Sequence, residues 1–172
     1  MDLILETERL IHRPLLLSDL DEFFIMNYNP NVNLYMRNPI KSKNDVYLYI
    51  QKIINEYESN KIGRFAVILK ETNELIGFSG LKFRDKLENG HINFYDIGYR
   101  FSEKYWHKGF ANESSLAWLD YGFNTMKLPT IYACAFSDNV GSNKVLNKIG
   151  FEFINQYLDG NLLLNWYEIK QK

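Results

Sequence analysis

The spacing of apolar residues changes about a third of the way along the chain, and this change constrains the fold more than any other feature. Before it, Val46, Ile50 and Ile53 recur at intervals of three and four residues, which predicts a helix. After it, residues 64–70 and 75–84 form two apolar runs separated by polar turn residues, which predicts a β-hairpin. A chain that mixes helices and adjacent strands in this way is expected to form an α/β fold with a mixed sheet.

The remaining runs give the order β-α-α-β-β-β-α-β-α-β-β. In the strand expected at 91–101, the apolar side chains change parity between Phe94 and Tyr95. A β-bulge would cause such a change, because alternate residues of a regular strand face opposite sides. A strand that is apolar on both faces is the alternative. The other expected strands are 9–15, 131–136, 151–157 and 162–169, and the expected helices are 20–28, 46–57, 111–126 and 142–149, with caps at Ser18 or Asp19, Asn44 or Asp45, and Asp138 or Asn139.

Length and composition narrow the class of protein. The chain has 172 residues, the usual length of one domain, and residues 1–172 are predicted to form one. The formal net charge of −1 gives no overall field that would attract nucleic acid or an anionic membrane. The single Cys134 excludes an intramolecular disulfide, and no apolar run approaches the roughly 20 residues of a membrane span. Acidic residues come too early for a signal peptide, so a cytoplasmic protein without nucleic-acid or membrane partners is expected.

A glycine-containing segment joins the strand expected at 91–101 to the next helix. It reads Tyr105-Trp-His-Lys-Gly-Phe-Ala-Asn-Glu113. Its small residues would let main-chain amides at the helix N-terminus approach an anion, because the helix dipole makes that end positive. Lys108 would add a flexible positive charge. A tight turn without a ligand is the alternative, and the GxGxxG and GxxxxGKS/T fingerprints of dinucleotide and P-loop sites are absent.

Three ordered motifs carry a resemblance to a known family. They are residues 96–101 (DIGYRF), 105–113 (YWHKGFANE) and 138–151 (DNVGSNKVLNKIGF), and the opening 8–15 (ERLIHRPL) accompanies them. They closely resemble the GNAT acetyltransferase superfamily, and within it the ribosomal-protein N-terminal acetyltransferases of the RimJ/RimL type. The resemblance implies an α/β GNAT fold: a mixed, largely antiparallel sheet of about seven strands, with a splay or bulge at the fourth, flanked by about four helices.

The resemblance also implies that acetyl-CoA is the cosubstrate. The family's phosphate loop is usually written Q/R-x-x-G-x-G/A; here it reads Trp106-His-Lys-Gly-Phe-Ala111, so the first position departs from the pattern. The free edge of the preceding strand would pair with the amide-rich pantetheine arm by strand addition. By this resemblance, acetyl-CoA is bound by the strand edge at Tyr99, Arg100 and Phe101, by the amides of His107, Lys108, Gly109, Phe110, Ala111 and Asn112, and by Asn139.

Two residues of the motifs are candidates for catalysis. Asp96 matches the position at which many family members carry a Glu or Asp general base, and a water relay would compensate for the shorter Asp side chain. A hydrogen-bonded strand residue is the alternative for Asp96. Ser142 matches the family's later Ser and would donate a hydrogen bond to the thioester sulfur; a small packing residue is its alternative. Leu146 stands where many members place the Tyr that protonates the leaving thiolate, so that role is unfilled.

The resemblance therefore implies N-acetylation by direct attack of a bound amine on acetyl-CoA in a ternary complex. Direct attack is favoured because Cys134 lies in an apolar strand and no other activated nucleophile is evident. The first acceptor expected is the N-terminal α-amine of a protein or peptide. The alternatives are a small amine, such as a polyamine or an aminoglycoside, and a sensor that binds acetyl-CoA without transfer. A homodimer is open, and no metal is expected because His12, His91 and His107 lack metal-site spacing.

Overall fold

The hairpin expected after the change in periodicity lies inside the sheet. In the computed structural model, which describes residues 3–171, it is formed by β3 (Arg64–Leu69) and β4 (Glu74–Arg84). On either side, β2 (Leu10–Arg13) pairs with β3 and β5 (Phe94–Phe101) pairs with β4, both antiparallel. The expected meander of strands is therefore confirmed.

The sheet has eight strands in the order β1-β2-β3-β4-β5-β6-β8-β7. All seven expected strands are present, and the additional strand is the two-residue β1 (Leu5–Glu6). Every neighbouring pair is antiparallel except β5 and β6 (Thr130–Phe136), which are parallel. The final hairpin consists of β7 (Glu152–Asp159) and β8 (Leu162–Lys170), and β8 lies next to β6.

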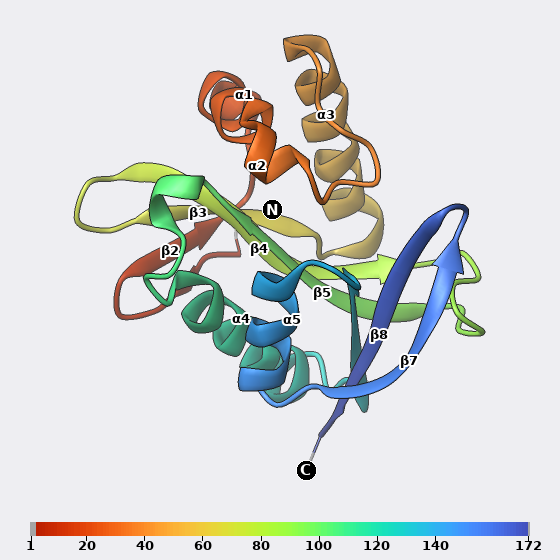
Figure 1. Cartoon of the computed structure of the whole chain (residues 1–172). Helices are drawn as coiled ribbons and strands as arrows, with labels where there is room; N and C mark the ends of the chain where they lie inside the picture. The colour runs from red at the N-terminus through yellow and green to blue at the C-terminus, as the bar shows by residue number, and fades with distance from the viewer. Residues whose placement is uncertain (1–2, 172) are drawn as a thin grey trace.

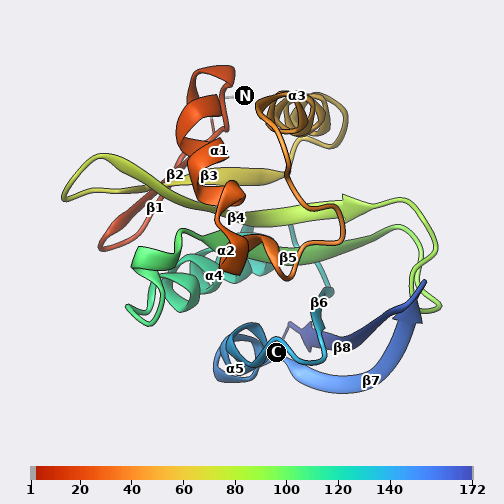
Figure 2. The same cartoon turned by 45° about the horizontal axis from the view of Figure 1, so that its top comes forward.

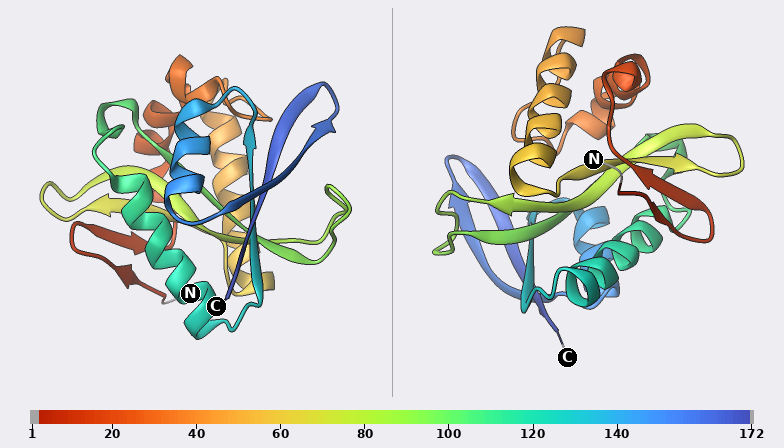
Figure 3. Two further views of the ribbon diagram at one scale, coloured as in Figure 1. Left: turned by 60° about the horizontal axis from the view of Figure 1, so that its bottom comes forward. Right: turned by 180° about the vertical axis from the view of Figure 1, so that it is seen from behind.

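Helices cover both faces of the sheet (Figure 1). α1 (Leu20–Tyr28) and α3 (Lys43–Asn60) lie on one face. α4 (Phe110–Asp120) and α5 (Val140–Lys148) lie on the other, which faces the viewer in the left panel of Figure 3. The four-residue α2 (Pro30–Asn33) is added to the four expected helices. Within residues 3–171, no helix is long and apolar enough to cross a membrane.

Aromatic side chains anchor the helices to the two faces. Phe23 of α1 packs edge-on against Phe78 of β4, with ring centroids 5.4 Å apart. On the other face, Trp118 of α4 lies 4.9 Å from Phe65 of β3. Trp118 is fully buried, whereas Leu116, which the helical spacing had placed on the apolar face, is 52% exposed. Burying large aromatic surfaces of this kind dominates core stability.

Two local predictions about the elements are wrong. The cap of α3 is Ser42, whose side chain accepts from the Asp45 amide; Asp45 is the third helical residue and completes a capping box. The bulge expected at Phe94–Tyr95 is absent, because β5 pairs with β4 in one continuous register. The parity change instead marks a strand that is apolar on both faces, which was the alternative; Phe94 packs against Tyr132 of β6 and Trp166 of β8.

The sheet divides between β5 and β6. These strands pair at one residue pair only, Asp96 with Tyr132. In Figure 2, β6 and the β7–β8 hairpin turn away from the layer formed by β1 to β5. The expected splay of the sheet is therefore present, and it results from the divergence of two parallel strands.

Candidate active site

Both chemical motifs follow the strand ends at this division. The segment 105–113 comes after β5, and the segment 138–142 comes after β6. From Gly98 to Phe101, β5 has no paired residue in β6, because the two strands pair at Asp96 and Tyr132 only. Ligands of α/β sheets bind in the crevice outside the carboxyl ends of strands that part in this way. The division between β5 and β6 is therefore the candidate site.

The loop between β5 and α4 presents a helix N-terminus without a capping side chain. Gly109 is the N-cap residue of α4, and its φ of +83° lies in the left-handed region that favours glycine. By contrast, α2, α3 and α5 begin with the capping side chains of Asn29, Ser42 and Asn139. The first amides of a helix have no partner within it, so those of α4 are available to an anion.

Other contacts fix the shape of this loop. Trp106 donates its indole N–H to the carbonyl of Phe101 at 2.8 Å, which ties the loop to the end of β5. His107 has a left-handed backbone, with φ +62°. The side chains of His107 and Lys108 are exposed, whereas Phe110 is buried. The six amides predicted to hold phosphate thus run from an exposed turn into the first turn of α4.

Asn112 gives an independent sign that this loop takes a polar ligand. It is the third residue of α4, and its Oδ1 is buried with no hydrogen-bond partner within residues 3–171. An unpaired buried polar atom costs free energy unless something satisfies it. The unpaired atom is an acceptor, so it needs a donor such as an N–H or O–H group of a ligand; a phosphate oxygen could bind only the Nδ2 donors of this side chain.

The three residues predicted at the β5 edge have different side-chain surroundings. Arg100 points toward α1, where it donates to Asn27 Oδ1 at 2.5 Å and lies 4.9 Å from the centre of the Phe78 ring. Phe101 is buried, and Tyr99 contacts α5. The predicted pairing with pantetheine needs only main-chain groups, and the Phe101 carbonyl already accepts from the Trp106 indole. The Ser102 amide donates to the Ile76 carbonyl of β4, and main-chain groups alternate in direction along a strand, so those of Arg100 face β4 and those of Tyr99 face away from it. Tyr99 is therefore the better candidate for that pairing, which stays a prediction.

The geometry of Asp96 argues against the predicted general base. Its buried carboxylate binds two guanidinium groups: Oδ1 accepts from Arg64 at 2.8 Å, and Oδ2 accepts from Arg84 at 2.7 and 3.0 Å. Burial alone would raise the pKa of Asp96, but the two arginines outweigh it and hold the pKa below its usual range. A carboxylate in this state accepts a proton weakly. The alternative, a hydrogen-bonded strand residue, describes Asp96 better.

Gly98 leaves room for this charged cluster. A Cβ at Gly98 would lie 2.5 Å from Arg64 Nη2, so a larger residue would displace the guanidinium from Asp96. Arg64 also donates to the carbonyl of Asp96 at 2.9 Å. The glycine of the DIGYRF motif is thus explained by the close approach of an arginine from β3.

Ser142 lies at the start of α5 and contacts β5. Its amide donates to Asn139 Oδ1 at 3.0 Å, so the prediction that Asn139 caps this helix is confirmed. The Oη of Tyr99 lies 3.1 Å from Ser142 Oγ and 3.1 Å from the Ser142 carbonyl oxygen. Burial raises the pKa of Tyr99, so its phenol keeps its proton at neutral pH. The phenol can donate its one hydrogen either to the Ser142 carbonyl oxygen or to Ser142 Oγ. When it donates to Oγ, the hydroxyl of Ser142 can donate its own hydrogen to another acceptor.

Leu146 and Asn143 of α5 set the surroundings of Ser142. Leu146, which replaces the family's acid Tyr, is buried in the core, so the phenol of Tyr99 is the hydroxyl that adjoins Ser142. Asn143, which the sequence analysis missed, donates to the Phe136 carbonyl of β6 at 2.9 Å. It also accepts from Tyr167 of β8 at 2.7 Å. Asn143 thereby fixes α5, and with it Ser142, to the far side of the divided sheet.

Cys134 offers no alternative nucleophile of evident reactivity. It lies on β6 with its Sγ 3.4 Å from Arg37 Nη2. Burial raises the pKa of the Cys134 thiol, and the Asp96 carboxylate adds to the effect. A thiol that resists ionisation is a poor nucleophile.

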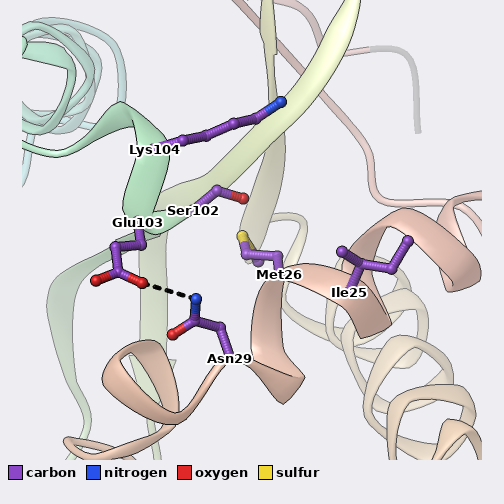
Figure 4. Close-up of a pocket in the computed structure, with 6 residues that line it drawn as sticks. All are labelled: Ile25, Met26, Asn29, Ser102, Glu103 and Lys104. Carbon is purple, nitrogen blue, oxygen red and sulfur yellow. Dashed lines mark hydrogen bonds between the residues drawn. The ribbon is translucent and has the colours of Figure 1, made fainter.

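A pocket of about 460 Å³ lies on the α1 side of β5 (Figure 4). It is bounded by the end of α1 and by the turn that follows β5, and Asn29 donates to Glu103 across it at 2.8 Å. It contains none of the predicted site residues. Its lining consists of Ile25, Met26, Asn29, Ser102, Glu103 and Lys104.

The divided sheet, the open helix N-terminus after β5 and Ser142 in the first turn of α5 together form a site in which an anion could bind beside a hydroxyl group. Residues 9–152 match the family described as the acetyltransferase (GNAT) domain. The chain belongs to this family and is an acetyl-CoA-dependent acyltransferase. The predicted family and fold class are therefore confirmed.

Individual similar proteins agree with this assignment. The uncharacterized N-acetyltransferase p20 of Bacillus licheniformis is 36% identical over 149 residues, which are 86% of this chain and 82% of that protein. A GNAT-family acetyltransferase from Bacillus anthracis has a TM-score of 0.82 and 28% identity, covering 98% of both chains. RimL, a ribosomal L7/L12 α-N-protein acetyltransferase solved with coenzyme A, has a TM-score of 0.79 and 17% identity over 98% of both chains, a likeness of fold.

Gly109→Val should weaken CoA binding by tenfold or more. The substitution forces a β-branched residue into a left-handed backbone, which costs roughly 1–2 kcal/mol, and displaces the amides that face the phosphates. Isothermal calorimetry with CoA measures the effect. Gly90→Val is the matched control, because Gly90 has a φ of +82° in the β4–β5 turn and no heavy atom within 4 Å of its Cβ position. Equal losses in both variants would contradict the role of the loop.

Asp96→Asn should lower the free energy of unfolding by about 3–5 kcal/mol, because it leaves the buried guanidinium of Arg64 and the partly buried one of Arg84 uncompensated. Denaturant unfolding at pH 7 measures this. Asp21→Asn, which breaks an exposed pair with Lys43, should cost at most about 1 kcal/mol.

The pH dependence of the stability of the parent and of Asp96→Asn tests whether the Asp96 carboxylate is ionised at neutral pH. Its folded pKa is lowered, so its stabilising effect is complete above the unfolded pKa of about 3.9 and is lost as the pH falls through the folded value. The difference in unfolding free energy between parent and Asp96→Asn should therefore be constant from pH 6 to 8 and shrink below pH 4. A difference that changes near pH 7 would show that Asp96 titrates there as a base.

Proposed function

We propose that this enzyme acetylates the N-terminal α-amine of a protein or peptide. The neutral amine attacks the acetyl carbonyl of acetyl-CoA; a C–N bond forms, the C–S bond breaks, and CoA leaves as the thiolate. The proton lost by the amine passes through solvent to the thiolate, so that CoA ends as the thiol. Motifs that resemble the RimJ/RimL branch support this acceptor. The likeness of fold to RimL agrees with it.

The observation that carries the proposal is the state of Asp96. With two guanidinium partners and a lowered pKa, this carboxylate is poorly suited to deprotonate a strongly basic amine. An α-amine needs little help, because its pKa of about 7.7–8.0 makes deprotonation at pH 7 cost roughly 1.2 kcal/mol. For a lysine amine, with a pKa of about 10.4, the cost is roughly 4.6 kcal/mol. A site without a poised base therefore favours an α-amine.

The chain's own residues have distinct parts in this scheme. The amides of residues 107–112 would hold the phosphates of the cosubstrate, and the edge of β5 would align its pantetheine arm. The hydroxyl of Ser142, supported by Tyr99, would donate a hydrogen bond to the departing sulfur. A thiol with a pKa near 8.5 leaves readily as the anion, so a hydrogen bond suffices without full proton transfer.

Several earlier predictions stay predictions. The small-amine acceptor, whether polyamine or aminoglycoside, and the non-catalytic sensor are competing outcomes of the experiment below. The single domain over residues 1–172, the homodimer, the cytoplasmic location and the independence from metal are likewise proposals that belong to this scheme.

A matched pair of peptides tests the acceptor. One has a free N-terminus and no lysine; the other has the same sequence with a blocked N-terminus and one lysine. At pH 7 the free α-amine should be preferred by on the order of 10²-fold in kcat/KM, following the difference in deprotonated fraction. Thiol release measures the rate, and mass spectrometry locates the acetyl group.

The panel also includes a polyamine and an aminoglycoside. A better rate with either of these, or with the lysine peptide, would contradict the α-amine proposal while leaving the transferase intact. Background rates with every acceptor, together with normal CoA binding, would support the sensor instead.

Ser142→Ala should lower kcat by about 10–100-fold, the loss expected when a hydrogen bond to a charged group is removed. The affinity for CoA should stay within twofold. The defect should shrink with an acetyl donor whose thiol has a lower pKa, because that group needs less stabilisation. Ser59→Ala, at an exposed position of α3, is the control. An unchanged kcat in Ser142→Ala would leave Ser142 as a packing residue only.

A further inference from the structure

We propose that Arg9 is a positioning residue for the phosphate-binding loop: it neutralises Glu113 and holds the carbonyl of Lys108, so that the loop presents positive potential and correctly directed amides to CoA. This inference rests on the acetyl-CoA-binding loop of the proposed function. It adds to that site a residue from the other end of the chain, which belongs to the opening ERLIHRPL segment.

Arg9 contacts the loop at three points. Its Nε donates to Glu113 Oε2 at 2.6 Å, and its Nη2 lies 2.6 Å from the same oxygen. Its Nη1 donates to the main-chain carbonyl of Lys108 at 3.1 Å. Its guanidinium lies over the ring of Phe110, 4.4 Å from the centroid. One side chain therefore holds the residue before Gly109, the residue after it and the first turn of α4.

The carboxylate of Glu113 would repel a phosphate bound at the N-terminus of α4, and Arg9 neutralises its charge. Glu113 lies in the first turn of α4, beside the amides that would face phosphate. Burial alone would raise the pKa of Glu113, but hydrogen bonds from Thr7 and Arg9 outweigh it and hold the pKa below its usual range. Glu113 is therefore ionised at neutral pH. A negative charge at this position opposes a second anion at the same helix end, unless a cation pairs with it.

The bond to Lys108 sets the direction of an amide. In a trans peptide unit the C=O and the following N–H point in opposite directions. Arg9 holds the Lys108 carbonyl on its own side of the loop, so the N–H of Gly109 points away from Arg9. Gly109 is one of the residues whose amides are expected to bind phosphate, and its φ of +83° belongs to this arrangement.

A purely structural role explains the pair less well. The Arg9 side chain is 42% exposed and the Glu113 side chain 18%, so solvent screens the pair in part and limits what it contributes to stability. Arg13, the last residue of β2, forms a pair with Asp19 at 2.7 Å but has no contact with the loop among its hydrogen bonds. Arg13 is therefore the matched control for the loss of an arginine and its ion pair.

A double-mutant cycle tests the proposal by the affinity for CoA, measured by isothermal calorimetry. Arg9→Met should raise the Kd on the order of tenfold, because it exposes CoA to the uncompensated Glu113 charge and frees the Lys108 carbonyl. Arg9→Met/Glu113→Gln should bind CoA at least threefold more tightly than Arg9→Met alone, since the opposing charge is gone. Arg13→Met should change the Kd less than twofold.

Steady-state kinetics give the second readout. Arg9→Met should raise the KM for acetyl-CoA about tenfold and leave kcat and the acceptor KM within twofold. If Arg9→Met fails to fold by circular dichroism, Arg9→Lys keeps the charge but not the two-pronged contact, and its Kd should lie between those expected for parent and Arg9→Met.

The outcomes separate this inference from the proposed function. A parent protein that does not bind CoA would overturn both. Normal CoA binding with an unchanged Kd in the Arg9 variants, or a double variant that binds no more tightly than Arg9→Met, would overturn the role of Arg9 alone. A failed acetyl transfer with the expected binding cycle would overturn the transferase scheme and leave the role of Arg9 intact.

Discussion

The opening between β5 and β6 depends on a buried cluster of charges. Asp96 forms the one pair that joins these strands, and its carboxylate binds Arg64 of β3 and Arg84 of β4. One side chain thus connects three strands at the place where the sheet divides. Separated strands lose the ladder hydrogen bonds that would otherwise align them, so the charged cluster helps to fix the near wall of the site. The cluster is sensitive to the loss of any one partner, because an unpaired charge would remain buried.

The pattern of apolar residues along the sequence predicted most of the helices and strands of the fold. All seven expected strands and all four expected helices are present, because the spacing of apolar residues, short apolar runs and turn residues together indicated each of them. The errors arose where two causes give the same local pattern. A parity change at Phe94–Tyr95 follows equally from a bulge and from a strand that is apolar on both faces, and only the register of β4 with β5 separates these two explanations. Asp45 looked like a cap because caps and third helical residues favour the same side chains.

The motifs located the site but did not give the state of its residues. The resemblance identified Asp96, Ser142 and the loop at 107–112 by position. It could not show that Asp96 meets two arginines, because Arg64 and Arg84 lie outside every motif. It also could not show that Tyr99 meets Ser142, 43 residues further on. Contacts over such separations are set by the packing of the whole sheet. Sequence resemblance therefore predicted which residues line the site, and geometry decided which of them are free to react.

Arg9 reaches the loop because β2 lies on the side of the sheet where α4 begins, and Thr7 adds a 2.6 Å bond to Glu113. Thr7 and Arg9 consequently contact the loop proposed to bind the coenzyme, although they lie 106 and 99 positions from their partners in it along the chain. Shortening the chain at its amino-terminal end, or fusing a rigid tag close to Thr7, would lower the affinity for CoA before it disturbs the core around Trp118. Recombinant forms with different amino-terminal extensions would then differ in their affinity for the coenzyme, although their catalytic residues are the same.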